Sequence, residues 1–144
     1  MFEYRRLGKF TFHVITNKSK IKPFLVKWLD KEWQQDHKEY PDQIWIVDWL
    51  NLLASMKFHL EVIELGSIKL REDLMNYKNE SYSFLGELKS RVDEMEEAIL
   101  QGSSIGPLIV NKENMELMDG YTRYMILKKN GAKEVYVYIG SVEK

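Results

Sequence analysis

The sequence contains no cysteine among its 144 residues. Disulfide frameworks, cysteine nucleophiles and thiolate metal sites are therefore excluded. Histidine is scarce as well, and His13, His37 and His59 do not stand at the short spacings that metal-binding histidines adopt. We interpret all three as ordinary surface or core residues and expect no protein-built metal centre.

Long apolar runs are also missing, and the first residues, MFEYRRLGKF, lack the apolar stretch of a signal peptide. We expect a cytoplasmic protein with no membrane partner. Apolar residues make up 44% of the chain and charged residues 30%. A chain of this size and composition can bury one core beneath a well-solvated surface, as a single domain does.

A strong excess of positive charge is absent too, because the net charge is −1. The two parts of the chain differ, since residues 1–40 carry a net +4 and residues 41–144 a net −5. Proteins dedicated to duplex DNA usually present a strongly basic face. A DNA partner is compatible with the modestly basic N-terminal segment but is not favoured.

The first part of the chain predicts one strand and two helices. KFTFHVIT (9–16) alternates as a strand does. Helical spacing follows over 17–39, with Pro23 expected in the first turn. A second helix, apolar nearly all round, is expected over 43–56. Residues 1–56 would then form an N-terminal extension packed on the core, with a buried apolar stripe and tryptophans that we assign to core packing: Ile21, Phe24, Leu25, Trp28, Leu29, Trp33, Trp45 and Trp49.

The remainder predicts an α+β domain over 57–144 with a mixed sheet and flanking helices. KFHLEVIEL (57–65) alternates as a strand does, and residues 68–90 are expected to form a loop with short helical pieces. An amphipathic helix follows over 90–100, with Val92, Met95, Ile99 and Leu100 together on its apolar face. We then expect a hairpin over 107–118, a helix from Gly120 to Lys129 closed by Asn130-Gly131, and a strand over 134–140.

The segment Asp-Gly-Tyr-Thr-Arg (119–123) suggests a phosphate site at a helix start. The first turn of a helix has N–H groups without intrahelical partners and carries partial positive charge. Gly120 permits close approach of a ligand to the backbone, Thr122 adds a hydroxyl, and Arg123 offers a fork of donors that matches phosphate oxygens. The alternative is structural: Asp119 could be the N-cap and Arg123 could lie on a solvated face.

The stretch EMEEAILQGSSIGPLIVNKENMELMDGYTRYMILKKNGAKEVYVYIG (94–140) resembles the ParB/sulfiredoxin superfamily. The shared order is a helix, a glycine turn, proline with an apolar strand, a hairpin, Gly-x-x-Arg opening a helix, and a strand. LEVIELGSIKL (60–70) is similar to the opening strand of that family and its I-P-L-x-x-I box. The resemblance covers residues 57–142 and implies a ParB/sulfiredoxin-like fold there.

The resemblance implies nucleotide binding at the Gly-x-x-Arg helix start. Members bind ATP (sulfiredoxin), CTP (ParB partition proteins) or ADP and ATP (free serine kinases), and others are described as ParB-like nucleases. The DGYTR segment is most similar to the D-G-H-H-R version of the kinase-like branch. Transferred to this chain, the resemblance assigns the phosphates to Gly120 and Arg123 and makes Asp119 a candidate for metal or acid–base work. Tyr121 and Thr122 stand where the kinase-like branch prefers histidines, and they are further phosphate-binding candidates through hydroxyl donors. A base after the first strand corresponds to Glu72, with Asp73 as the weaker choice.

Differences between this sequence and the motifs of the family restrict which nucleotide and which reaction we expect. Sulfiredoxin chemistry requires a cysteine, which this chain lacks. ParB has Gly-Glu-Arg-Arg where this chain has a single arginine, which argues against partition-type CTP hydrolysis. The cofactor expected is therefore ATP or ADP with Mg²⁺, in preference to CTP. Ser103 and Ser104, in the glycine-flanked loop GSSIGP, are further phosphate-binding candidates, although such loops are as often plain connectors.

Three hypotheses follow from the sequence. The first is a nucleotide-binding protein of the ParB/sulfiredoxin fold, with phosphotransfer to an unknown small-molecule acceptor as its candidate reaction. The second is a ParB-like DNA-binding or nuclease domain. The third is a non-catalytic relative that binds a partner protein.

Overall fold

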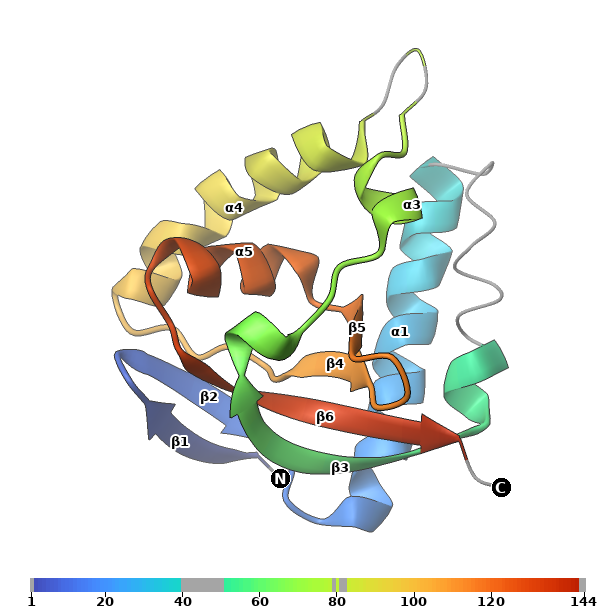
Figure 1. Cartoon of the computed structure of the whole chain (residues 1–144), viewed down its shortest axis with the longest axis vertical. Coiled ribbons are helices and arrows are strands. Elements are labelled where there is room, and N and C mark those ends of the chain that lie inside the picture. Colours follow the sequence, from blue (N-terminus) through green and yellow to red (C-terminus); the bar gives the residue numbers. More distant parts are fainter. Residues whose placement is uncertain (1, 40–50, 79, 81–82, 143–144) are drawn as a thin grey trace.

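The computed structural model describes residues 2–39, 51–78, 80 and 83–142, apart from the side chains of 33–39. The elements in chain order are β1 (Glu3–Leu7), β2 (Phe10–Val14), α1 (Lys18–Glu39), β3 (Met56–Glu64), the 3₁₀ turn η1 (Leu65–Ser67), α3 (Glu72–Met75), α4 (Phe84–Leu100), β4 (Leu108–Asn111), β5 (Glu116–Asp119), α5 (Tyr121–Lys129) and β6 (Glu134–Val142). Residues 51–54 are also helical. Figure 1 shows their arrangement.

The main sheet has four strands in the order β3-β6-β4-β5. β6 pairs antiparallel with β3 and parallel with β4, while β4 and β5 form an antiparallel hairpin. β1 and β2 form a separate hairpin, which joins the body where Phe12 bridges Ile105. The sheet is therefore mixed, and the predicted α+β class with flanking helices is confirmed.

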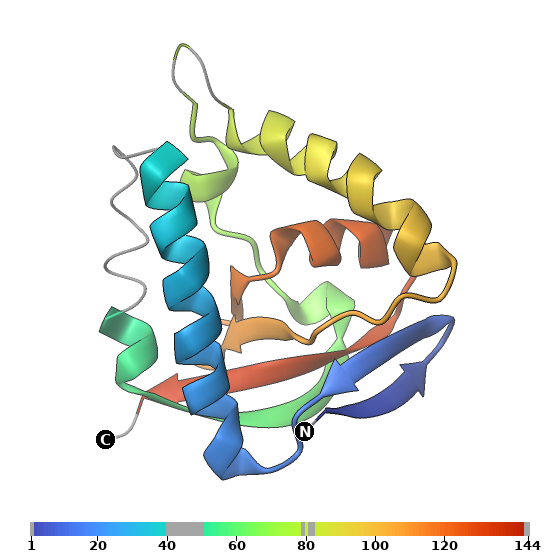
Figure 2. The ribbon, with the colours of Figure 1, turned by 180° about the vertical axis from the view of Figure 1, so that it is seen from behind.

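Helices cover both faces of the main sheet. Alternate residues of β4 divide between two apolar clusters, with Leu108 and Val110 in one and Ile109 in the other. The first cluster lies beneath α5, and α4 packs on α5 on the side away from the sheet (Figure 1). The second cluster lies beneath α1, which crosses the opposite face (Figure 2). The start of α5 and the end of β5 thus lie close to α1, although they are far from it in sequence.

The N-terminal part differs from its prediction in three ways. β1 was not predicted, because EYRRL is mostly exposed and has too few apolar residues to mark a strand. Pro23 is the sixth residue of α1 rather than a first-turn residue, so the helix lacks the hydrogen bond that a residue there would donate to Ser19. Of the predicted stripe, Ile21, Leu25 and Leu29 are buried, whereas Trp28 is 46% exposed.

Other predictions for this part fall outside what the structure describes. The side chain of Trp33, both Trp45 and Trp49, and most of the predicted second helix lie outside the described residues. Within the described part, no helix is long and apolar enough to cross a membrane.

The second part of the chain follows its prediction closely, except at α4. The β4–β5 hairpin, α5 and β6 all form where expected, and Asn130 caps α5 ahead of Gly131, whose φ is +77°. α4 begins at Phe84, earlier than predicted, because the Ser83 hydroxyl accepts a hydrogen bond from the Gly86 N–H and caps the helix. Its buried side chains are Leu88, Val92 and Ile99; the predicted partners Met95 and Leu100 are 42% and 50% exposed.

Candidate functional site

The candidate site begins where β5 turns into α5. Gly120 is the N-cap of α5 and has a φ of +100°, a left-handed conformation that side-chain-bearing residues rarely adopt. The Tyr124 N–H donates to the Gly120 carbonyl at 2.8 Å and closes the first turn. The N–H groups of residues 121–123 come before this first intrahelical hydrogen bond. They lie in the part of a helix that can donate N–H groups to a ligand. The cap is Gly120, so the alternative with Asp119 as N-cap is wrong.

Arg123 folds back over this helix start. Its Nη1 donates to the Gly106 carbonyl at 3.1 Å and to the Pro107 carbonyl at 3.0 Å, and its Nη2 donates to Asp119 Oδ2 at 3.2 Å. The side chain is 19% exposed, so it does not lie on a solvated helix face. A guanidinium has five N–H donors. The Nε–H and one Nη2–H therefore have no partner among the described residues.

Two glycines make room for this guanidinium. A Cβ on Gly120 would lie 2.8 Å from Arg123 Nη2 and 2.8 Å from Leu108 Cδ2. A Cβ on Gly106 would lie 2.9 Å from Arg123 Nη1 and 3.3 Å from His13 Nε2. The contacts under 3.0 Å, to Arg123 and Leu108, leave no room for a Cβ unless those groups move. The space beside Gly106 and Gly120 is thus filled by the Arg123 side chain and is not open to solvent.

Asp119, the last residue of β5, forms an ion pair with Arg123 of α5. The Asp119 side chain is 26% exposed. Burial raises the pKa of its carboxyl above the ordinary value, and the Arg123 charge and the Gly120 N–H oppose that rise only in part. The site therefore combines a fixed cation with a carboxyl that takes up a proton more readily than a solvated aspartate.

His13 was not predicted to belong to the site. Its Nδ1 shares a hydrogen bond of 2.9 Å with Ser104 Oγ, and β2 is tied to the same loop by the His13 N–H, which donates to the Ile105 carbonyl at 3.0 Å. Burial lowers the pKa of the imidazole, and the nearby Arg123 charge lowers it further, so His13 is neutral at pH 7. The alternation of β2 predicted that His13 lies on the other face of the strand from Phe12 and Val14. It gave no indication of the contact with Ser104, which is 91 residues away in the sequence.

A cavity of about 50 Å³ adjoins Arg123. Its lining combines residues from the α5 start and the loop before β4 with aromatic rings from the N-terminal part. The lining residues are Phe2, His13, Phe24, Leu25, Trp28, Gly106, Pro107, Ile109, Asp119, Arg123 and Tyr138. The site is thus shared between the predicted extension and the predicted ParB-like domain.

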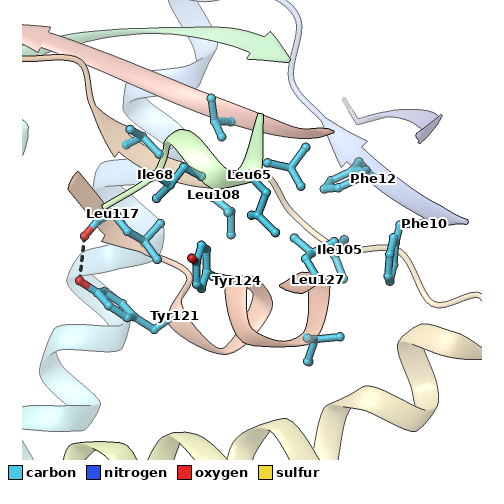
Figure 3. Packing of buried hydrophobic residues seen from close by; sticks show 14 of the residues in the cluster. Phe10, Phe12, Leu65, Ile68, Ile105, Leu108, Leu117, Tyr121, Tyr124 and Leu127 are labelled. Carbon is cyan, nitrogen blue, oxygen red and sulfur yellow. Dashed lines mark hydrogen bonds between the residues drawn. The ribbon is translucent and has the colours of Figure 1, made fainter. Parts of the chain in front are cut away.

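Tyr121 does not present its side chain to a ligand. Its ring is 7% exposed and packs edge-on against Phe84. Its hydroxyl donates to the Leu117 carbonyl at 3.1 Å (Figure 3). The same hydroxyl accepts from the Arg71 N–H at 3.1 Å. Of this predicted phosphate-binding residue, only the backbone amide lies at the helix start.

We expect Tyr121→Phe to alter the dependence of stability on alkaline pH. Burial raises the pKa of Tyr121 to about 12, against 10 when unfolded. The folded protein keeps the phenol neutral, so this contribution is complete below pH 10 and is lost between about pH 10 and 12 as the unfolded phenol ionises. The variant should be about 1–3 kcal/mol less stable at pH 7, because two backbone groups lose their partner. That difference should shrink above pH 10 in urea unfolding.

Tyr124→Phe is the control for this experiment, because it removes a hydroxyl from the same helix that has no hydrogen bond among the described residues. A stability difference between wild type and Tyr121→Phe that stays constant from pH 7 to 11.5 would contradict the assignment.

The other predicted residues are dispersed. Thr122 is half-buried beside Arg123 in sequence, and Ser104 contacts His13. Ser103 and Glu72 are exposed, and neither lines the cavity; Glu72 is the first residue of α3. Asp73, the weaker choice of base, pairs with Arg71 at 2.7 Å. Within the described residues, no three carboxylate or imidazole groups gather to hold a metal ion.

Comparisons with known proteins give a partial likeness. No family model matches the chain, and no curated protein does. Two solved structures of the pNOB8-like ParB N-domain are similar to it, with 29% and 26% sequence identity and TM-scores of 0.41 and 0.44. Each likeness covers 61% of this chain but 32% and 29% of the other, so the chain spans about a third of those proteins.

Proposed function

We propose that this protein binds ATP or ADP through phosphates placed at the start of α5, with phosphotransfer to a small-molecule acceptor as the candidate reaction. The observation that supports it most is the Arg123 guanidinium. Protein groups hold it over the helix start, and two of its N–H donors have no partner among the described residues. A phosphate there would meet a fixed cation and the amides of a helix N-terminus together.

The residues present fit a phosphate group. Gly120 has no side chain over the helix start, and α5 contributes its dipole and first-turn amides. His13, neutral at pH 7, can donate or accept a hydrogen bond without adding charge. Mg²⁺ would enter with the nucleotide, since this ion is usually held by substrate phosphates and one or two carboxylates. Asp119 is the carboxylate at hand.

Isothermal titration with ATP, ADP and CTP, each with Mg²⁺, tests the proposal. Saturable binding of ATP or ADP is expected, with CTP weaker. Absence of binding for all three nucleotides would overturn it.

Asp119→Asn should tighten the binding of nucleotide measured without Mg²⁺ severalfold at neutral pH, because no cation is then present for the carboxylate to hold. The ionised carboxylate repels phosphate, and the amide removes that charge while keeping an acceptor for Arg123. In wild type, affinity should fall as pH rises through the raised pKa of Asp119, because its ionised form then accumulates. The variant should lack this part of the pH dependence. Titrations between pH 4.5 and 8 provide the measurement.

Glu94→Gln is the matched control, since it removes one exposed carboxylate from α4, away from the cavity lining. Equal pH profiles for wild type and Asp119→Asn would count against a phosphate beside Asp119.

A second candidate function, DNA binding, is favoured by a different feature. A groove of about 960 Å³ runs between α1 and the β3 end of the sheet. Four of its lining residues are lysines: Lys18, Lys22, Lys27 and Lys57. Three of them, Lys18, Lys22 and Lys27, come from the modestly basic N-terminal segment, so part of its positive charge lines one surface, where it could contact a phosphate backbone.

Gel-shift titration at 50 and 200 mM salt tests this candidate. The double substitution Lys18→Glu and Lys27→Glu should weaken any DNA complex, and the wild-type complex should weaken steeply with salt. Lys89→Glu with Lys112→Glu, two exposed lysines outside the groove, makes the same charge change as a control. Lack of a complex at 50 mM salt would rule this candidate out.

A further inference from the structure

Trp28 stands out on α1 because it is 46% exposed. Its neighbours on the helix, Leu25 and Leu29, are 2% exposed and fix α1 on the sheet. Trp28 therefore contributes little to holding the helix in place. Trp28 also lines the cavity that contains Arg123, so its exposed ring is available to a molecule bound there.

A row of aromatic rings connects Trp28 to the interior of the site. Trp28 stacks on Phe24 with ring centroids 6.3 Å apart and an interplanar angle of 24°. Phe24 meets Phe2 edge-on at 5.4 Å, and Phe2 meets His13 edge-on at 5.0 Å. Phe24 thus packs against the indole of Trp28, and Phe2 in turn packs against Phe24.

Trp28 and Phe24 line the same cavity as Arg123 and Asp119. Its volume, about 50 Å³, is far below the several hundred Å³ of a pocket that encloses a small molecule. A ligand anchored at Arg123 would therefore extend outward across the cavity mouth. Among the aromatic side chains that line the cavity, Trp28 is the most exposed.

We propose that the exposed indole of Trp28 stacks the base of a purine nucleotide whose phosphates are bound at Arg123. This inference rests on the proposed function and deepens it, because it distinguishes a nucleotide from other phosphate esters. Every base has a π-face, so stacking tolerates different bases but favours the larger purines. ATP and GTP should then bind with similar affinity, and CTP more weakly.

Tripolyphosphate separates the two parts of the proposal, because it has the phosphates of ATP but no base. Trp28→Leu should lower ATP affinity roughly fivefold to a hundredfold, the range measured for loss of one stacked base. It should leave tripolyphosphate affinity unchanged. Trp28→Phe should retain most of the ATP affinity, since a phenyl ring still stacks. Arg123→Ala should weaken both ligands.

The outcomes are distinguishable by isothermal titration and intrinsic fluorescence. An ATP-induced fluorescence change that is present in wild type and missing in Trp28→Phe would support the stacking. If Trp28→Leu weakens ATP and tripolyphosphate equally, or neither, the stacking role is overturned while phosphate binding stands. If Arg123→Ala changes neither ligand, the phosphate site itself is overturned. Circular dichroism confirms that each variant is folded; substitution at an exposed position should not disturb the core.

Discussion

Arg123→Ala should lower the affinity for ATP by at least about tenfold, and for tripolyphosphate by the same factor. Hydrogen bonds to a charged group contribute about 1.5–3 kcal/mol each, and 1.4 kcal/mol is a factor of ten. The alanine removes both N–H donors that have no partner among the described residues, and it removes the positive charge. The helix amides remain, so residual weak binding is expected. Isothermal titration at fixed salt measures the loss.

Two further variants separate charge from geometry. Arg123→Lys keeps the charge but loses the planar fork, so its affinity should lie between wild type and alanine. Arg71→Ala removes an equally charged arginine whose side chain pairs with Asp73 outside the cavity lining, and it should bind like wild type. Wild-type affinity in Arg123→Ala, or equal losses in Arg123→Ala and Arg71→Ala, would contradict the proposed site.

Arg123→Ala also tests the folded structure. The Gly106 and Pro107 carbonyls both accept from Nη1, so alanine leaves two carbonyls of a half-buried loop without that donor. Loss of such partners costs about 1–3 kcal/mol. Binding should therefore be measured at a temperature where thermal unfolding shows the variant to be folded.

The sheet and its helices could be predicted from the sequence because their apolar periods are strong. β4 and β6 are apolar runs bounded by turn residues, and α5 is bracketed by Gly120 and Asn130. β1 and the first turn of α4 lacked that signal. Tertiary contacts decide both, since β1 is stabilised by pairing with β2, and the Ser83 cap stands after a polar stretch without periodicity.

The candidate site was predictable in part. The motif placed a glycine and an arginine at a helix start, and both are there. It did not indicate that Gly106 and Pro107 would accept from Arg123, or that His13 and Trp28 would adjoin it. Those contacts join α1, β2 and the loop before β4, and no local pattern connects segments so far apart. Exposure of Trp28 was equally hidden, because helical spacing alone assigned it to the core.

Gly120→Ala should be the most destabilising single-methyl change at the site. Two costs combine, since an alanine at φ +100° is strained by about 1–3 kcal/mol, and its Cβ would collide with Leu108 Cδ2 and Arg123 Nη2, each 2.8 Å away. Overpacking of this kind adds about 1–3 kcal/mol. Leu108 is fully buried between β4 and α5, so it has little space to yield.

Gly102→Ala isolates the first cost, the backbone strain. Gly102 has a φ of +111°, close to that of Gly120, but an added Cβ would meet nothing within 4 Å. Its loss in urea unfolding measures the backbone strain alone, so the extra loss in Gly120→Ala measures the collision. Because that collision displaces the Arg123 guanidinium, Gly120→Ala should also weaken tripolyphosphate binding, and Gly102→Ala should not. Equal stability losses and unchanged binding in both variants would mean that Gly120 serves the turn alone and that Arg123 does not depend on the space beside it.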